Sequence, residues 1–171
     1  CNLRGFHPPG LFGPVGAAAA SAKTLGLDQI QTRMALGIAA SHTGGLTANT
    51  GTMVKSTHPG AAARQGVEAA LLAQAGFVSH DSIIEAHQGY VDVLFGTEFD
   101  WDALTRDLGT TFQLVAPGFN IKRYPAQIYM QWAIEAALTL QQRYHIRAED
   151  VTYLELEVPA GHVRRGHEDV R

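Results

Sequence analysis

The stretch of residues 42–75, HTGGLTANTGTMVKSTHPGAAARQGVEAALLAQA, constrains the fold more than any other because it joins two opposed patterns. Its first part, Gly44–Gly60, holds four glycines, one proline and five hydroxyl side chains, which predicts an extended loop. Its second part repeats apolar residues at helical spacing, and Pro59 suits a first helical turn, where its missing N–H needs no partner. We therefore expect a loop that is ordered only by tertiary contacts and a helix that begins near Pro59.

Lys55 and His58 stand at the junction between this loop and this helix. The N-terminus of a helix carries unpaired backbone N–H groups and a partial positive charge, so it favours anions. The two side chains next to it predict a site for a carboxylate or a phosphate. A solvated lysine beside a capping histidine is the alternative, and spacing does not decide between the two.

The composition excludes several classes of protein. With 46% apolar residues, 17% charged residues and a net charge of −3, the chain is expected to be soluble and globular, with no basic surface for nucleic acid and no membrane-spanning segment. The single cysteine, Cys1, allows no internal disulfide and indicates a reducing compartment. We predict a cytoplasmic location, or the mitochondrial matrix in a eukaryote. Because the chain opens with CNLRGFHPPG and not with Met, we expect an internal piece of a longer protein.

Helical patterns dominate the first two thirds of the chain. An alanine-rich segment with small residues predicts a helix buried between others, and Asp28 is placed to cap the next helix. Gly76 is placed to end the third one. The helices expected here are Gly13–Leu25, a second from Asp28 to Ser41, Pro59–Ala75, and shorter ones at Asp81–Glu85 and Asp100–Leu108, around a mixed apolar segment at Gly89–Phe95.

The composition and the residue pattern of the sequence change near Gly109. Thr110–Lys122 contains β-branched and aromatic residues around a Pro-Gly pair, which favours extended chain with a turn. A long helix is expected from Pro125, with its buried side marked by Met130, Ala133, Ile134, Ala137 and Tyr144. Val151–Val158 alternates apolar and polar residues, as a half-buried strand does. The fold class is therefore mainly α, with residues 1–109 in a helical domain and residues 110–171 beginning a smaller α+β domain.

Two of the eight histidines are candidates for chemistry. His7 lies in the rigid segment GFHPP just before the alanine-rich helix, and His42 ends a helix beside a Gly-Gly turn. An imidazole with a pKa of about 6.5 can give or take a proton near neutral pH. A capping or packing role is the alternative for both. The sequence contains no HExxH motif and no cysteine set, so we expect no metal site.

Four segments together resemble the central part of the MmgE/PrpD family: GFHPPGLFGPVGAAAASAKTLGLD, ALGIAASHTGGL, GTMVKSTHPGAAARQGVEAALLAQAGF and KRYPAQIYMQWAIEAALTL. That family includes 2-methylcitrate dehydratase, cis-aconitate decarboxylase and iminodisuccinate epimerase. The resemblance covers residues 5 to about 158, in order. It implies a large helical domain, a smaller α+β lid with the active site between them, a homodimer, and activity without a cofactor.

The resemblance also assigns roles to particular residues. His7 resembles the family's catalytic histidine and Lys55 its active-site lysine, and both agree with the choice made from the residues alone. His58 closes the lysine segment and is expected to have a structural or substrate-orienting role, and we place His42 with it among the substrate-binding candidates. Gln127 stands where decarboxylase-type members carry histidine. A glutamine can bind a carboxylate but cannot shuttle a proton, so this departure argues against decarboxylation.

These observations predict a cofactor-independent lyase that transfers a proton next to a carboxylate of a small di- or tricarboxylic acid, with a dehydratase favoured. An epimerase or a decarboxylase of the same family is the alternative within enzymes. A non-catalytic helical module that binds a partner protein is the alternative outside them, since an alanine-rich bundle would have a similar composition.

Overall fold

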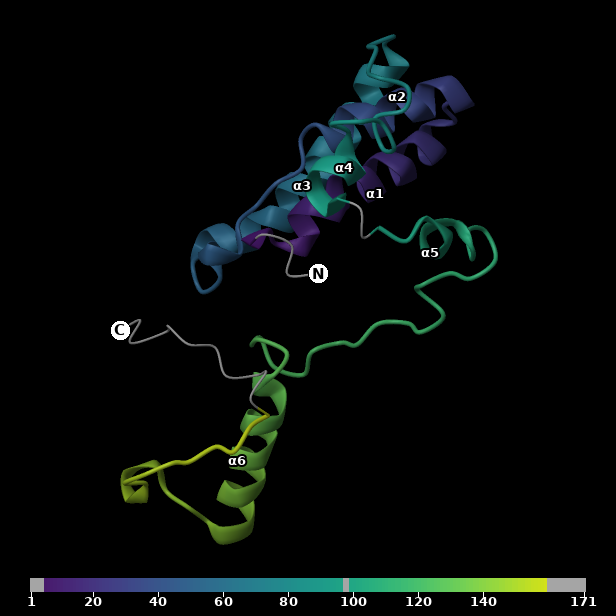
Figure 1. Cartoon of the computed structure of the whole chain (residues 1–171). Helices are drawn as coiled ribbons and strands as arrows, with labels where there is room; N and C mark the ends of the chain where they lie inside the picture. The colour runs from purple at the N-terminus through teal and green to yellow at the C-terminus, as the bar shows by residue number, and fades with distance from the viewer. Residues whose placement is uncertain (1–4, 97–98, 160–171) are drawn as a thin grey trace. The chain divides into compact units, whose positions relative to one another are not determined.

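The structure of the protein is a computed structural model that describes residues 5–96 and 99–159. The chain divides into two compact units, Cys1–Thr105 and Arg106–Arg171, and each is described by itself. Within the described residues the chain is mainly helical, as the sequence predicts (Figure 1). No helix in this part of the chain combines the length and the apolar character that crossing a membrane requires.

Three helices form the core of the first unit: α1 (Pro8–Leu25), α2 (Gln29–Ala40) and α3 (Met53–Gln74). They lie alongside one another, and each packs against the other two (Figure 1). Most of the buried core side chains are alanines, which confirms the prediction of an alanine-rich helix buried between others. The core cluster comprises Ala18, Ala22, Ala35, Ile38, Ala39, Ala69, Ala70 and Ala73.

Glycine brings α3 into direct contact with α1. A Cβ atom added to Gly66 would lie 2.3 Å from the Cβ of Ala17 and 2.6 Å from the backbone nitrogen of Ala18. A Cβ atom on Gly13 would lie 2.7 Å from the Cβ of Ala62. The two helix backbones can approach this closely only because both positions lack a side chain.

The predicted cap at Asp28 is confirmed. Its carboxylate accepts a hydrogen bond from the backbone N–H of Gln31 at 2.8 Å, and the Gln31 side chain accepts one from the backbone N–H of Asp28. This reciprocal arrangement satisfies two N–H groups that the start of α2 would leave unpaired. Gly76, with φ of +87°, follows the end of α3 as predicted.

Two predicted helix starts in the first unit are wrong. α1 begins at Pro8, five residues before Gly13, because Pro8 and Pro9 fill the first two helical positions, which need no N–H donor. α3 begins at Met53, six residues before Pro59, so that Pro59 lies inside the helix. Lys55 and His58 are consequently helical residues and not loop residues.

The polar segment before α3 is ordered by its own hydroxyl groups, contrary to the expectation that only tertiary contacts order it. The Thr50 hydroxyl donates to the Thr47 carbonyl at 2.7 Å, and the Thr52 hydroxyl donates to the Asn49 carbonyl at 2.9 Å. These short-range bonds stabilise a 3-10 turn, η2 (Thr47–Asn49), and the residues that follow it. The loop therefore ends at residue 52, and α3 begins at position 53.

The remainder of the first unit contains two short helices. Asp81–Glu85, expected to be helical, forms turns, whereas the apolar segment after it forms α4 (Tyr90–Phe95). The Tyr90 hydroxyl donates to the Leu11 carbonyl at 2.9 Å, which ties α4 to α1. α5 (Trp101–Thr105) is shorter than expected.

The second unit contains α6 (Met130–Tyr144) and a 3-10 turn, η4 (Ala148–Asp150). α6 begins five residues after the expected Pro125, because the side chain of Gln131 binds both the N–H and the carbonyl of Tyr124 and holds residues 123–126 in a bend. Thr110–Lys122, expected to be extended chain with a turn, contains no helix and includes a turn at residues 113–117.

Two further expectations for this unit are wrong in its described residues, 106–159. The predicted buried side of α6 is not buried, and Val151–Val158 forms no strand. A strand is defined by hydrogen bonds to a neighbouring strand, and an amphipathic helix needs a second layer to cover it. Residues 106–159 provide neither a neighbouring strand for Val151–Val158 nor a second layer to cover α6. That residues 110–171 begin a lid domain stays a prediction.

Substituting Gly66 tests the close approach of the helices. We expect Gly66→Ala to lower the free energy of unfolding of the full-length protein by about 1–3 kcal/mol, because the new methyl group overlaps α1. The matched control is Gly60→Ala on the same helix, where a Cβ atom meets nothing within 4 Å. That control should stabilise by about 0.5–1 kcal/mol through helix propensity. Urea denaturation of both variants checks this, and equal effects would contradict the packing argument.

Candidate active site

The segment before α1 is joined to the loop after α2 by backbone contacts. Phe6 and Leu46 form an antiparallel bridge, and the His7 N–H donates to the Gly45 carbonyl at 2.9 Å. The Gly44 N–H donates to the Gly10 carbonyl at 2.9 Å. A Cβ atom on Gly10 would collide with the Gly44 carbonyl oxygen, at 1.8 Å. These contacts hold His7, the residue that precedes the first turn of α1, against the Gly44–Leu46 segment.

His58 reaches the same place from α3. Its Nδ1 lies 2.9 Å from the Nδ1 of His7, and the two ring centroids are 5.0 Å apart. The residue is buried, with 9% of its surface exposed. Its ring lies against Gly45, where a Cβ atom would be 3.1 Å from the ring and where φ is +100°. Glycine at position 45 therefore has two effects: it allows the positive φ, and it leaves room for the His58 ring.

Lys55 lies one turn before His58, in the first turn of α3. It is half-buried, and no acidic residue shares that first turn. Thr52, which precedes the helix, makes no side-chain cap, since its hydroxyl donates to Asn49 instead. A cation next to the positive end of a helix is unfavourable by itself, and an anion bound there would relieve both charges.

The electrostatics of His7 follow from this arrangement. Burial, the charge of Lys55 and the proximity of His58 each lower the pKa of His7 below its ordinary value of 6.5. All three act against the imidazolium form, because a cation is costly away from water and beside another cation. His7 is therefore mainly neutral at pH 7 and able to accept a proton.

The other two predicted site residues lie elsewhere. His42 follows the end of α2, is exposed, and lines a cavity of about 540 Å³ with Ser41, Phe77 and His80. Gln127 belongs to the second unit, is exposed, and accepts a hydrogen bond from the Tyr129 N–H at 2.8 Å. The structure thus brings His7, His58 and Lys55 together. Substrate binding by His42 and Gln127 stays a prediction.

The contact between the two histidines was not foreseen from the sequence. Sequence reasoning placed His58 beside Lys55, and it treated the Gly-Gly pair only as a neighbour of His42. Gly45 was nevertheless the available signal, because a residue without a side chain allows close approach by a ring.

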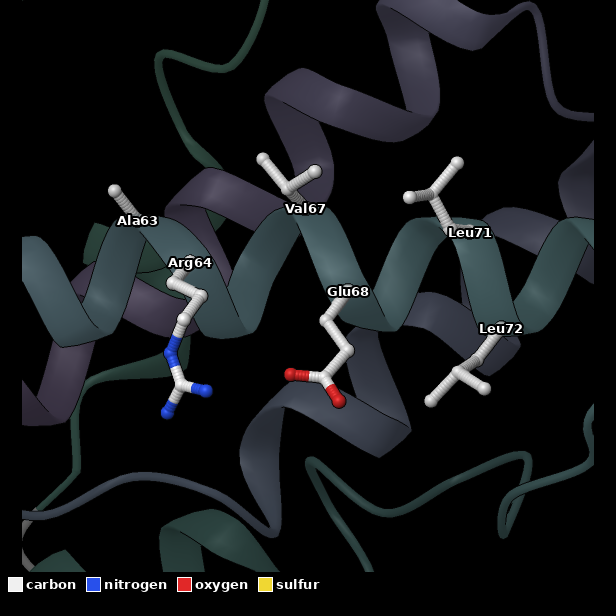
Figure 2. A pocket seen from close by; sticks show the side chains of 6 residues that line it. All are labelled: Ala63, Arg64, Val67, Glu68, Leu71 and Leu72. Atoms are coloured by element: carbon white, nitrogen blue, oxygen red, sulfur yellow. The ribbon is translucent and has the colours of Figure 1, made fainter.

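A second hollow, of about 570 Å³, lies further along α3. Figure 2 shows Ala63, Val67 and Leu71 pointing to one side of the helix at four-residue spacing, while Arg64 and Glu68 point to another. This hollow is mostly apolar and its two charges are of opposite sign. The cluster of His7, His58 and Lys55 has the titratable groups that acid–base chemistry needs, so we take that cluster as the candidate active site.

A metal ion needs several ligating side chains in one place. In residues 5–96 and 99–159, no three His, Cys, Asp or Glu side chains lie together in a suitable arrangement.

Comparison with known sequences identifies the family. Residues 1–102 match the MmgE/PrpD N-terminal domain, so the chain belongs to the MmgE/PrpD family. The chain is 35% identical over 144 residues to the human (Homo sapiens) protein named cis-aconitate decarboxylase, a match that covers 84% of this chain and 29% of that protein.

Other relatives carry the same name. The mouse (Mus musculus) cis-aconitate decarboxylase is 34% identical over 160 residues, which are 94% of this chain and 31% of that protein. The Aspergillus terreus enzyme of that name is 31% identical over 147 residues, which are 82% of this chain and 30% of that protein. The matches therefore span about three tenths of the length of these relatives.

The influence of Lys55 on His7 can be measured directly. In the full-length protein, we expect Lys55→Met to raise the pKa of His7, because the substitution removes one of the charges that disfavour the imidazolium. A pH titration of the His7 ring signals by NMR checks this. Lys23→Met is the control, since Lys23 lies in the last turn of α1, about 24 Å along the helix from His7. An unchanged His7 pKa in Lys55→Met would show that the two side chains do not interact.

Proposed function

We propose that this chain carries part of the active site of a lyase that acts, without a cofactor, on a small di- or tricarboxylic acid. The observation that carries the proposal is the cluster of His7, His58 and Lys55 at the start of α3. A neutral imidazole next to a fixed cation is suited to proton transfer on an anionic substrate. The names of the relatives support the lyase class.

Lys55 and His7 have distinct tasks in this proposal. Lys55 and the N-terminus of α3 bind a substrate carboxylate. When the carbon next to that carboxylate loses a proton or CO2, its bonding electron pair is delocalised onto the carboxylate oxygens. The Lys55 ammonium then binds the reacting molecule more strongly in the transition state than in the ground state, which accelerates the reaction. His7 accepts or donates the proton.

Two reactions compete within this class. The relatives named cis-aconitate decarboxylase favour decarboxylation, in which the carbon–CO2 bond breaks and the carbon takes a proton. Gln127 favours dehydration, because an amide cannot supply that proton in place of the histidine of decarboxylase-type members. We place decarboxylation of a tricarboxylic acid first, because the similarity to the relatives of that name extends over most of the chain. We place dehydration second, because the argument for it depends on Gln127 alone.

An epimerase and a non-catalytic module are less well supported. An epimerase needs an acid and a base on opposite faces of one carbon, whereas His7 and Lys55 both come from the first unit and lie close together. A non-catalytic module has no reason to place two histidines and a lysine at one helix end. The homodimer, the cytoplasmic location and the lid remain proposals by resemblance to the family.

Loss of the Lys55 charge tests the proposal. In the full-length protein, Lys55→Met should lower kcat/KM on the order of a hundredfold or more, as removal of one donor to a developing oxyanion does. The fold should be retained within about 0.5 kcal/mol, because Lys55 is half-buried and fills no core position. Lys23→Met is the control and should leave the rate unchanged. Wild-type activity in Lys55→Met would exclude the role given to this lysine.

The choice between decarboxylation and dehydration is tested by products. The full-length protein is assayed with cis-aconitate for CO2 release and with 2-methylcitrate for water loss. We expect saturable CO2 release from cis-aconitate. If water loss alone is observed, Gln127 becomes the explanation, and Gln127→His should then add a weak decarboxylase activity without accelerating dehydration, because it restores a group with a pKa of about 6.5.

A further inference from the structure

The contact between the Nδ1 atoms of His7 and His58 restricts the protons on both rings. At 2.9 Å, one nitrogen must carry the hydrogen and the other must offer its lone pair. A neutral imidazole has one hydrogen, on Nδ1 or on Nε2. In the neutral pair, one ring is therefore the Nδ1–H tautomer and the other is the Nε2–H tautomer.

This bond occupies the Nδ1 of His7 and leaves Nε2 as the ring nitrogen that can meet a substrate. We infer that His58 is a positioning residue, which holds the ring and the tautomer of His7 so that Nε2 of His7 exchanges the proton during the reaction. The inference rests on the proposed function, in which His7 is the acid–base group. It assigns to His58 a role through His7 and not through the substrate.

The surroundings of His58 suit such a role. The residue is buried, it lies on a 22-residue helix, and its ring rests on Gly45. The backbone N–H of His7 is bound to the carbonyl of that same Gly45. Both rings are thus located relative to one residue, and a partner that is itself fixed can fix the orientation of a catalytic imidazole.

The proton inventory is consistent with this role. When Nε2 of His7 accepts a proton from a substrate carbon, the C–H bond breaks and an N–H bond forms, and His7 becomes an imidazolium. Its Nδ1–H then donates to the lone pair on Nδ1 of His58, so the two rings stay joined while His7 carries the added proton. In dehydration, His7 then gives the Nε2 proton to the departing hydroxyl, which restores the neutral pair. In decarboxylation no C–H bond breaks: the carbon that loses CO2 takes a proton from Nε2 of an imidazolium His7, and the neutral His7 is protonated again by water.

In the part of the chain that the structure describes, few groups act on His7. Lys55 and His58, both on α3, are the titratable residues that shift its pKa. The Gly44–Leu46 segment and the first residues of α1 also lie against it and carry no titratable side chain. Changes at His58 should therefore be visible in the pH dependence of the reaction.

Two substitutions in the full-length protein test the role of His58. His58→Phe keeps a ring but removes the nitrogen, and kcat should fall on the order of tenfold to a hundredfold with little change in KM, as loss of the partner that orients a metal-binding imidazole does. His58→Asn should restore most of kcat, because its amide can reach the Nδ1 position and can donate or accept. The acid limb of kcat/KM should move to higher pH in His58→Asn, since one cause of the lowered His7 pKa is removed. His87→Asn, at an exposed histidine, is the control and should change none of these.

The inference is overturned if His58→Phe keeps its kcat, or if folded His58→Asn is as slow as His58→Phe. Nitrogen NMR of histidine-labelled wild-type protein gives an answer that does not depend on activity. We expect one of the two rings to be protonated on Nδ1 at neutral pH, and finding hydrogen only on the Nε2 atoms of both would overturn the pairing. If the wild type converts none of the acids, the proposed function fails while this NMR result still decides whether the pair exists.

Discussion

The close approach of α3 to α1 is the constraint on which the rest of the first unit depends. Gly66 has no side chain where α3 meets Ala17 and Ala18, so the two backbones come into contact. The alanine core fills the narrow space that remains between the helices. His7 precedes α1 and His58 lies on α3, so the separation of these two helices also sets the 2.9 Å contact between their rings. Packing and chemistry therefore share one cause.

Backbone contacts and charge complete the site. Gly10 allows the first turn of α1 to lie directly on the backbone of Gly44, where a side chain would collide, and Gly45 leaves room for the His58 ring. Lys55 then stands in the first turn of α3 with no acidic neighbour there. Cations at that end of a helix weaken the helix, and they are favourable only when an anion binds. A small stability cost in the free protein is what a carboxylate site would require.

Local patterns in the sequence predicted local structure well. The cap at Asp28, the alanine-rich helix and the glycine after α3 each depend on residues within a few positions, and each was confirmed. Errors arose where one local signal outweighed others. Pro59 predicted a helix start, although the hydroxyls of Thr50 and Thr52 close the preceding turn and let α3 begin at Met53. Val151–Val158 alternates as a strand does, but pairing needs a partner strand.

By itself the sequence determined the helical class, the family and the choice of His7 and Lys55, because helical periodicity, motif order and residue chemistry can all be read along one chain. Only the tertiary structure decided that His7 meets His58, 51 residues away, and that His42 lines a cavity without either of them. Such contacts depend on how closely helices pack and on which backbone segments touch. Packing distances of this kind result from many small side chains acting together, and no local pattern contains them.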